Sequence, residues 1–108
     1  MLLGQSKENI TRLMDAGELK VSIYGLGRVG LPLAVAWLRA GQKVIGADID
    51  LETVTQINKG LSPFQDEPQI PQAVEYFVRD GRFIATTDLI KASENSNVKF
   101  ITVPTTTS

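Results

Sequence analysis

The stretch of sequence that decides the fold runs from residue 20 to residue 48 and reads KVSIYGLGRVGLPLAVAWLRAGQKVIGAD. It begins with a short β-branched run, residues 20–24, that ends at a cluster of glycines. Apolar residues then recur at the spacing of a helix that packs on a sheet, at Leu31, Ala34, Val35 and Leu38. A second apolar run follows Gly41, a typical helix stop. The stretch therefore predicts one strand–helix–strand unit.

The same alternation continues to residue 103. The sequence predicts, in order, a helix capped by Asp50 and carrying Leu51, Val54 and Ile57, a proline-containing loop over 60–68, a helix over 70–79, a strand over 82–86, a short helix behind Asp88 and a strand over 98–103. Strands that alternate with helices form parallel sheets with right-handed crossovers. We therefore expect an α/β fold of the Rossmann type, with helices on both faces and at least four strands in the order 3-2-1-4.

Residues 1–19 look like a separate N-terminal leader before a domain that spans residues 20–108. Ile10, Leu13 and Met14 have helical spacing, so the leader is expected to contain a short amphipathic helix, either for packing or for binding a partner. The chain shows neither a signal peptide nor an apolar run long enough to span a bilayer, which predicts a cytoplasmic location.

Composition limits the chemistry that these 108 residues can perform. Lys and Arg number 11 and Asp and Glu number 12, so no basic excess favours nucleic acid or an anionic membrane as a partner. The sequence contains no cysteine and no histidine, which excludes a thiolate metal site, a cysteine nucleophile and the commonest general base. We therefore predict no metal site and no catalytic residue in this segment, and expect it to bind a ligand.

The glycine cluster has the spacing Gly25-x-Gly27-x-x-Gly30 and lies between a predicted strand and a predicted helix. In a dinucleotide-binding turn, Gly25 would permit the tight bend, Gly27 would let a diphosphate approach the backbone, and Gly30 would let the helix lie close to the strand. The helix N-terminus would offer unpaired N–H groups and a partial positive charge to the phosphates. A plain turn before a helix is the alternative interpretation.

Asp48 ends the second predicted strand, where an acidic residue can accept hydrogen bonds from the ribose hydroxyls of adenosine. A 2′-phosphate would meet a like charge there, so Asp48 favours NAD over NADP. Arg28, inside the loop, contacts either a phosphate or the adenine side of the pocket in this interpretation, and it softens the exclusion of NADP. Asp48 could instead be a helix-capping or solvated carboxylate.

The end of the fourth predicted strand is a second candidate region. Ligands of open parallel sheets bind beyond the carboxyl ends of the strands, which places Thr105 near the nicotinamide side, unless it is simply a strand terminus. Asp66 and Glu67 form a possible carboxylate pair, but a solvated loop is the preferred interpretation.

Together these residues resemble the UDP-glucose/GDP-mannose dehydrogenase family, and most closely its members that act on UDP-N-acetylmannosamine. The resemblance covers residues 20–106 and rests on VSIYGLGRVGLPLA at 21–34, VIGADID at 44–50, INKG at 57–60 with EP at 67–68, GRFIATTD at 81–88 and VPT at 103–105. It implies an N-terminal NAD-binding domain whose cofactor contacts include Arg28 and Val29 of the glycine loop, Asp48, and the segment Val103, Pro104 and Thr105.

The resemblance also implies what the whole enzyme does. Members of this family use NAD to oxidise the C6 hydroxyl of a nucleotide sugar to a uronate through a cysteine thioester, and the full-length protein is expected to be a homodimer. This chain has no cysteine, so we expect it to be inactive alone. It departs from the family pattern at Arg28, where tyrosine is usual, and at Thr106, where a proline is usual.

A regulatory NAD-sensing domain, of the type that controls potassium transport, is the alternative function. Such domains have a similar glycine loop and an acidic end to the second strand. The 62–68 loop and the helix over 70–79 fit that class poorly, because a short helix usually leads there directly to the third strand. A flavin-binding or methyl-donor-binding domain is supported only by the glycine loop.

Overall fold

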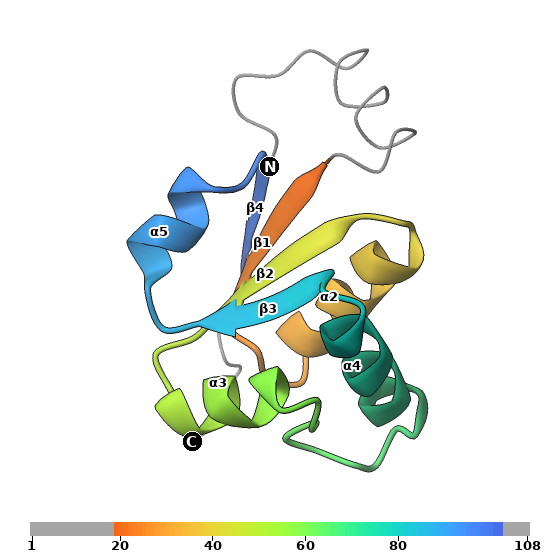
Figure 1. The fold of residues 1–108 in the computed structure, drawn as a ribbon. Coiled ribbons are helices and arrows are strands. Elements are labelled where there is room, and N and C mark those ends of the chain that lie inside the picture. The colour runs from red at the N-terminus through yellow and green to blue at the C-terminus, as the bar shows by residue number, and fades with distance from the viewer. Residues whose placement is uncertain (1–18, 103–108) are drawn as a thin grey trace.

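Four parallel strands form a single sheet in the computed structural model, which describes residues 19–102 (Figure 1). The strands are β1 (Lys20–Tyr24), β2 (Lys43–Ala47), β3 (Phe83–Thr86) and β4 (Val98–Ile101). Their spatial order is β3-β2-β1-β4, so the predicted order 3-2-1-4 is confirmed. In the centre of the sheet, Val21 of β1 is aligned with Val44 of β2 and with Val98 of β4. This alignment brings the carboxyl ends of the strands to one edge.

Three helices cover one face of the sheet. They are α2 (Gly30–Arg39), α3 (Leu51–Asn58) and α4 (Gln69–Arg79). The predicted stripe on α2 is buried together with Val21 and Ile23 of β1, and Trp37 lies against Phe100 of β4 with their ring centroids 5.6 Å apart. Burial of apolar surface stabilises a protein by about 25 cal/mol per Å², so this layer is the main source of stability.

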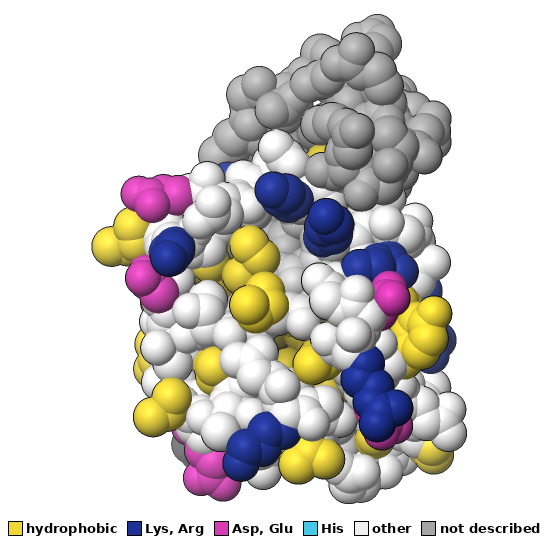
Figure 2. Space-filling view, viewed as in Figure 1, with side chains coloured by type: hydrophobic (Ala, Val, Ile, Leu, Met, Phe, Trp, Pro, Cys, Tyr) yellow, Lys and Arg dark blue, Asp and Glu magenta, His cyan; other side chains and the backbone are white. Residues whose placement is uncertain are grey.

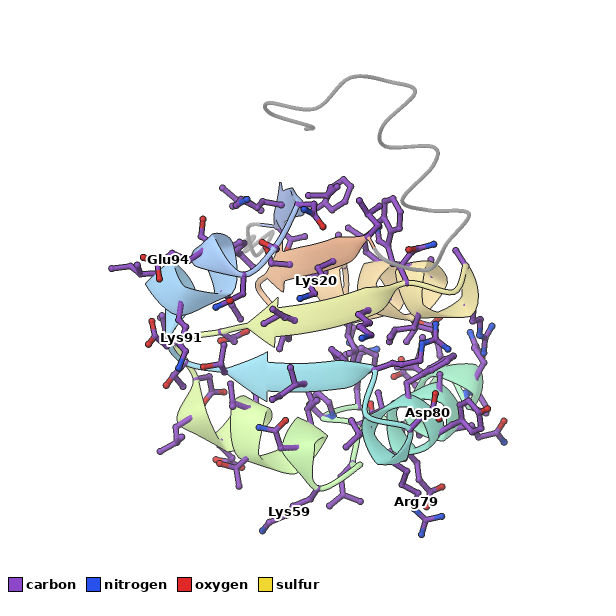
Figure 3. All side chains as sticks on the ribbon, turned by 45° about the horizontal axis from the view of Figure 1, so that its top comes forward. Lys20, Lys59, Arg79, Asp80, Lys91 and Glu94 are labelled. Atoms are coloured by element: carbon purple, nitrogen blue, oxygen red, sulfur yellow. The ribbon has the colours of Figure 1, made fainter. Side chains whose placement is uncertain are left out.

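Helix α5 (Leu89–Glu94) lies on the opposite face. Side chains alternate along β1, so Ser22 and Tyr24 point away from the core of Val21 and Ile23. The hydroxyls of Ser22 and Ser96 share a hydrogen bond of 2.9 Å, and the Tyr24 hydroxyl donates to the carbonyl of Leu89 at 3.2 Å. In Figure 3 the labelled charged side chains at the ends of α3, α4 and α5 point outward, away from the sheet.

This second face is only partly covered. Figure 2 shows hydrophobic side chains gathered near its centre, with basic side chains around them. Ile84 of β3 and Ile101 of β4 are 57% and 78% exposed. The helices on both faces confirm the predicted Rossmann-type architecture, with the first face packed more completely than the second.

The three apolar residues that the sequence places on α3 do not form one buried stripe. Leu51 is 67% exposed, whereas Val54 and Ile57 are buried. A helix turns about 100° per residue, so Leu51 lies about 120° around the axis from Ile57. Of these three apolar residues, Val54 and Ile57 are buried.

Two aspartates cap helices at the carboxyl edge of the sheet. Asp50 caps α3 by accepting from the N–H of Glu52, and Asp88 caps α5 by accepting from the N–H of Lys91, both as predicted. Residues 1–18 of the leader, with the expected amphipathic helix, lie outside the described residues, whereas Leu19 is buried in the core. No helix within residues 19–102 is long and apolar enough to cross a membrane.

Candidate functional site

A cleft of about 490 Å³ lies at the carboxyl ends of β1 and β2. Its lining combines the glycine loop, the end of β2, the start of α5 and the residue after β4: Tyr24, Gly25, Gly27, Arg28, Val29, Gly30, Ala47, Asp48, Ile49, Leu89 and Thr102. Every candidate site residue between 19 and 102 is therefore in one cleft. Val103, Pro104 and Thr105 lie outside the described residues, so their proposed cofactor contacts stay predictions.

Two of the three loop glycines are required by the backbone itself. Gly25 has a φ of +96°, and a Cβ there would lie 2.5 Å from Thr102 Oγ1. At Gly30 a Cβ would lie 1.6 Å from the carbonyl oxygen of Gly25, far closer than two non-bonded heavy atoms can approach. Gly30 therefore permits the close packing of α2 on the end of β1 that the motif predicts.

Gly27 differs from the other two glycines. A Cβ built at this position would meet no atom of the described structure within 4 Å. Gly27 is exposed and lines the cleft, so the missing side chain leaves open space for a ligand rather than for the protein. This is the geometry that a diphosphate approaching the backbone needs.

The N-terminus of α2 is free to bind an anion. Within residues 19–102, no group accepts a hydrogen bond from the backbone N–H of Gly27, Arg28 or Val29. Val29, at the N-cap, makes no capping bond through its side chain, and the first turn contains no acidic residue. Unpaired N–H groups and the positive end of the helix dipole therefore meet at the cleft, an arrangement that fits phosphate oxygens.

Asp48 stands at the wall of the same cleft, half-buried and held by the backbone. Its Oδ2 accepts from the N–H of Leu26 at 2.8 Å, and its Oδ1 accepts from the N–H of Asp50 at 2.9 Å. A carboxylate offers about four acceptor positions, so two remain for other donors such as ribose hydroxyls. The carboxylate thus fixes the glycine loop against β2 and can still bind a ligand.

The Arg28 side chain points to the loop between α3 and α4. Its guanidinium forms an ion pair with Asp66 and lies 4.6 Å from the centre of the Phe64 ring. The hydrogen bond from Arg28 holds the pKa of the Asp66 carboxyl below its usual value. From the sequence, Arg28 is expected on a phosphate or beside the adenine and Asp66 in a solvated loop; the contact between them is not predicted.

Four further residues of the cleft are not predicted from the sequence: Tyr24, Ile49, Leu89 and Thr102. Thr102 Oγ lies 2.8 Å from the carbonyl oxygen of Tyr24 and 2.9 Å from that of Gly25, and its hydroxyl donates to this pair. The signal was present, because Thr102 follows a strand in a parallel sheet, but the strand was expected to continue to residue 103. No group of acidic side chains within residues 19–102 could hold a metal ion.

Comparison with known proteins identifies the family. Residues 19–108 match the NAD-binding domain of the UDP-glucose/GDP-mannose dehydrogenase family. The chain belongs to this family. GDP-mannose 6-dehydrogenase from Pseudomonas aeruginosa is 38% identical over 87 residues, which are 81% of this chain and 20% of that enzyme. UDP-N-acetyl-D-mannosamine dehydrogenase from Pyrococcus horikoshii is 32% identical over the same shares.

Solved structures of dehydrogenases show the same fold. The ternary complex of GDP-mannose dehydrogenase from P. aeruginosa superimposes with a TM-score of 0.76 at 38% identity, covering 82% of this chain and 20% of that one. UDP-N-acetyl-mannosamine dehydrogenase from Staphylococcus aureus gives a TM-score of 0.69 at 29% identity, covering 79% of this chain and 19% of that one.

Membership of the family decides several points. NAD is the cofactor that the matched domain implies, and the residues at the cleft fit it. The relatives are nucleotide-sugar oxidoreductases, which favours an enzyme over the regulatory NAD-sensing alternative. The chain spans about a fifth of the length of the relatives it matches.

Proposed function

We propose that the chain is the NAD-binding portion of a dehydrogenase that oxidises the C6 hydroxyl of a UDP-sugar to a uronate. The observation that carries the proposal is the juxtaposition of two features in one cleft. The unpaired N–H groups of residues 27–29 lie at the N-terminus of α2, and the anchored carboxylate of Asp48 stands at the end of β2. An anion site beside a fixed acid suits a diphosphate joined to a ribose.

In this proposal each group has a separate task. The N–H groups of Gly27, Arg28 and Val29 bind the diphosphate, and the two remaining acceptor positions of Asp48 bind ribose hydroxyls. Ile49 and Leu89 give the cleft an apolar part, which suits the adenine ring. Val103, Pro104 and Thr105 would approach the nicotinamide side. NAD, when bound, supplies the hydride acceptor for the oxidation.

The chain by itself is proposed to be inactive. It contains no cysteine to form the thioester and no histidine to accept a proton, so it can bind the cofactor without completing the reaction. The UDP-sugar, the homodimer and the cytoplasmic location belong to the proposed full-length protein. Oxidation of a nucleotide sugar by the purified 108-residue chain would refute this part of the proposal.

Calorimetric titration of Asp48→Ala with NAD and with NADP tests the proposal. Loss of one charge-assisted hydrogen bond of about 1.5–3 kcal/mol weakens NAD binding about tenfold to a hundredfold. NADP binding is not weakened, because the substitution also removes the charge that repels the 2′-phosphate. The ratio of the affinity for NAD to the affinity for NADP therefore falls.

The same substitution removes the two backbone hydrogen bonds of Asp48, so a melting curve must accompany the titration. Loss of the fold would weaken both cofactors equally and leave their ratio unchanged. Glu75→Ala removes an exposed acid of α4 and serves as the control, with unchanged affinities. Equal binding of NAD and NADP by the unaltered chain would contradict the role of Asp48.

A further inference from the structure

The contact between Arg28 and the α3–α4 loop connects two parts of the molecule that the sequence separates by 38 residues. Asp66 forms the ion pair with the guanidinium, and the Phe64 ring lies under it, with 4.6 Å between Arg28 Cζ and the ring centre. We call these three residues the Arg28 clasp. The side chains of Arg28 and Asp66 are 63% and 57% exposed, so water and dissolved ions reach the pair.

The Arg28 clasp fixes the position of the Arg28 guanidinium, which lies beside Asp66 and Phe64. Arg28 is the one basic residue among the described residues that line the cleft. It lies two positions after Leu26, and the N–H of Leu26 donates to Asp48 Oδ2. If the guanidinium of Arg28 is released from Asp66, it still belongs to the glycine loop, which is bonded to Asp48. Guanidinium groups bind phosphate through paired, charge-assisted hydrogen bonds, so a released Arg28 is a ready partner for a phosphate on the ribose.

We propose that Asp66 is a specificity-determining residue for the cofactor: by pairing with Arg28 it withholds the only basic side chain of the described cleft from an adenosine 2′-phosphate, and so strengthens the preference for NAD. The inference rests on the proposed function, because it assumes that the ribose binds beside Asp48. Asp48 repels the 2′-phosphate directly, whereas Asp66 acts through Arg28 and touches no part of the cofactor.

The size of the effect follows from the exposure of the pair. An exposed ion pair is screened by water and holds its partners weakly, so release of Arg28 changes the affinity for NADP only about fivefold. Asp48 stays in place and continues to favour NAD. The selectivity therefore narrows but does not reverse when Asp66 is neutralised.

The test is calorimetric titration of the chain with NAD and with NADP in three variants. Asp66→Asn is expected to strengthen NADP binding about fivefold and to change NAD binding less than twofold. Glu67→Gln removes the same charge one residue further along, where the carboxylate faces Gln69 and not Arg28. This variant controls for the general effect of removing a negative charge on the binding of NADP, which is more anionic than NAD. It is expected to leave the preference for NAD over NADP unchanged.

The double variant Arg28→Gln/Asp66→Asn is expected to lose the gain in affinity for NADP, because the released guanidinium is then absent. Equal effects of Asp66→Asn and Glu67→Gln would overturn the inference, as would a gain that persists in the double variant. Failure of the unaltered chain to bind NAD refutes the proposed function. Normal NAD binding with unchanged NADP binding in Asp66→Asn refutes only the role of Asp66.

Discussion

Replacement of Gly27 by alanine separates the needs of the cofactor from the needs of the fold. In the protein alone, the added Cβ meets nothing within 4 Å among the described residues, and Gly27 is not one of the glycines with a positive φ. A glycine-to-alanine change at a compatible position stabilises a protein by about 0.4–1 kcal/mol through the unfolded chain. We therefore expect the free energy of unfolding to stay the same or to rise slightly.

Cofactor binding responds in the opposite direction. The methyl group occupies the space through which a diphosphate reaches the N–H groups of residues 27–29. Loss of one charge-assisted hydrogen bond of about 1.5–3 kcal/mol weakens NAD about tenfold to a hundredfold. Gly30→Ala is the contrasting variant, because its Cβ would overlap the Gly25 carbonyl oxygen and so unfold the site.

The assay pairs calorimetric titration with NAD and urea unfolding of the same sample. The expected result for Gly27→Ala is a stable protein that binds NAD weakly. A Gly27→Ala protein that binds NAD as tightly as the unaltered chain would refute the placement of the diphosphate. A protein that loses stability instead would refute the assignment of open space at this position.

Three further predictions concern the architecture around the cleft. Thr102→Val removes the hydroxyl that binds the carbonyl of the first loop glycine, and should lower the free energy of unfolding by about 1 kcal/mol in urea titration. In an NMR titration the pKa of the Asp66 carboxyl should lie below its usual value, and it should rise in Arg28→Gln, because the hydrogen bond from Arg28 is then lost. Because this pKa is lowered in the folded state, the ion pair of Arg28 and Asp66 stabilises the protein above the unfolded-state pKa of Asp66, and this effect is lost as the pH falls through the folded-state pKa. A difference in unfolding free energy between the unaltered chain and Asp66→Asn that does not change with pH over this interval would contradict the prediction. Leu51→Gln should leave the melting temperature unchanged, since Leu51 is exposed, whereas Ile57→Ala should cost about 2–5 kcal/mol; similar losses for both would show that α3 is packed differently.

Much of this fold is encoded in short-range patterns. The spacing of Leu31, Ala34, Val35 and Leu38 indicates the buried side of α2. The alternation of strands and helices predicts the parallel pairing of the four strands. Asp50 caps its own helix through bonds to Glu52 and Thr53, both within three residues. Such features need no knowledge of the rest of the chain, so sequence analysis finds them.

The contacts that were not predicted depend on how distant segments meet. Arg28 and Asp66 become partners only because the α3–α4 loop returns to the glycine loop. The bond from the Leu26 N–H to Asp48 joins two residues that follow the neighbouring strands β1 and β2, and neither residue type indicates this contact. Leu51 shows a different limit, because three apolar residues at a spacing of three drift around a helix instead of forming one stripe.

The central claim is that unpaired amides at the start of α2 bind the diphosphate of NAD. Amide chemical shifts of the isotope-labelled chain, followed during titration with NAD, test it residue by residue. The account predicts that the amides of Gly27, Arg28 and Val29 shift most, together with that of Asp50, whose N–H donates to Asp48. Large shifts confined to other parts of the chain, with these four amides unmoved at saturation, would contradict it.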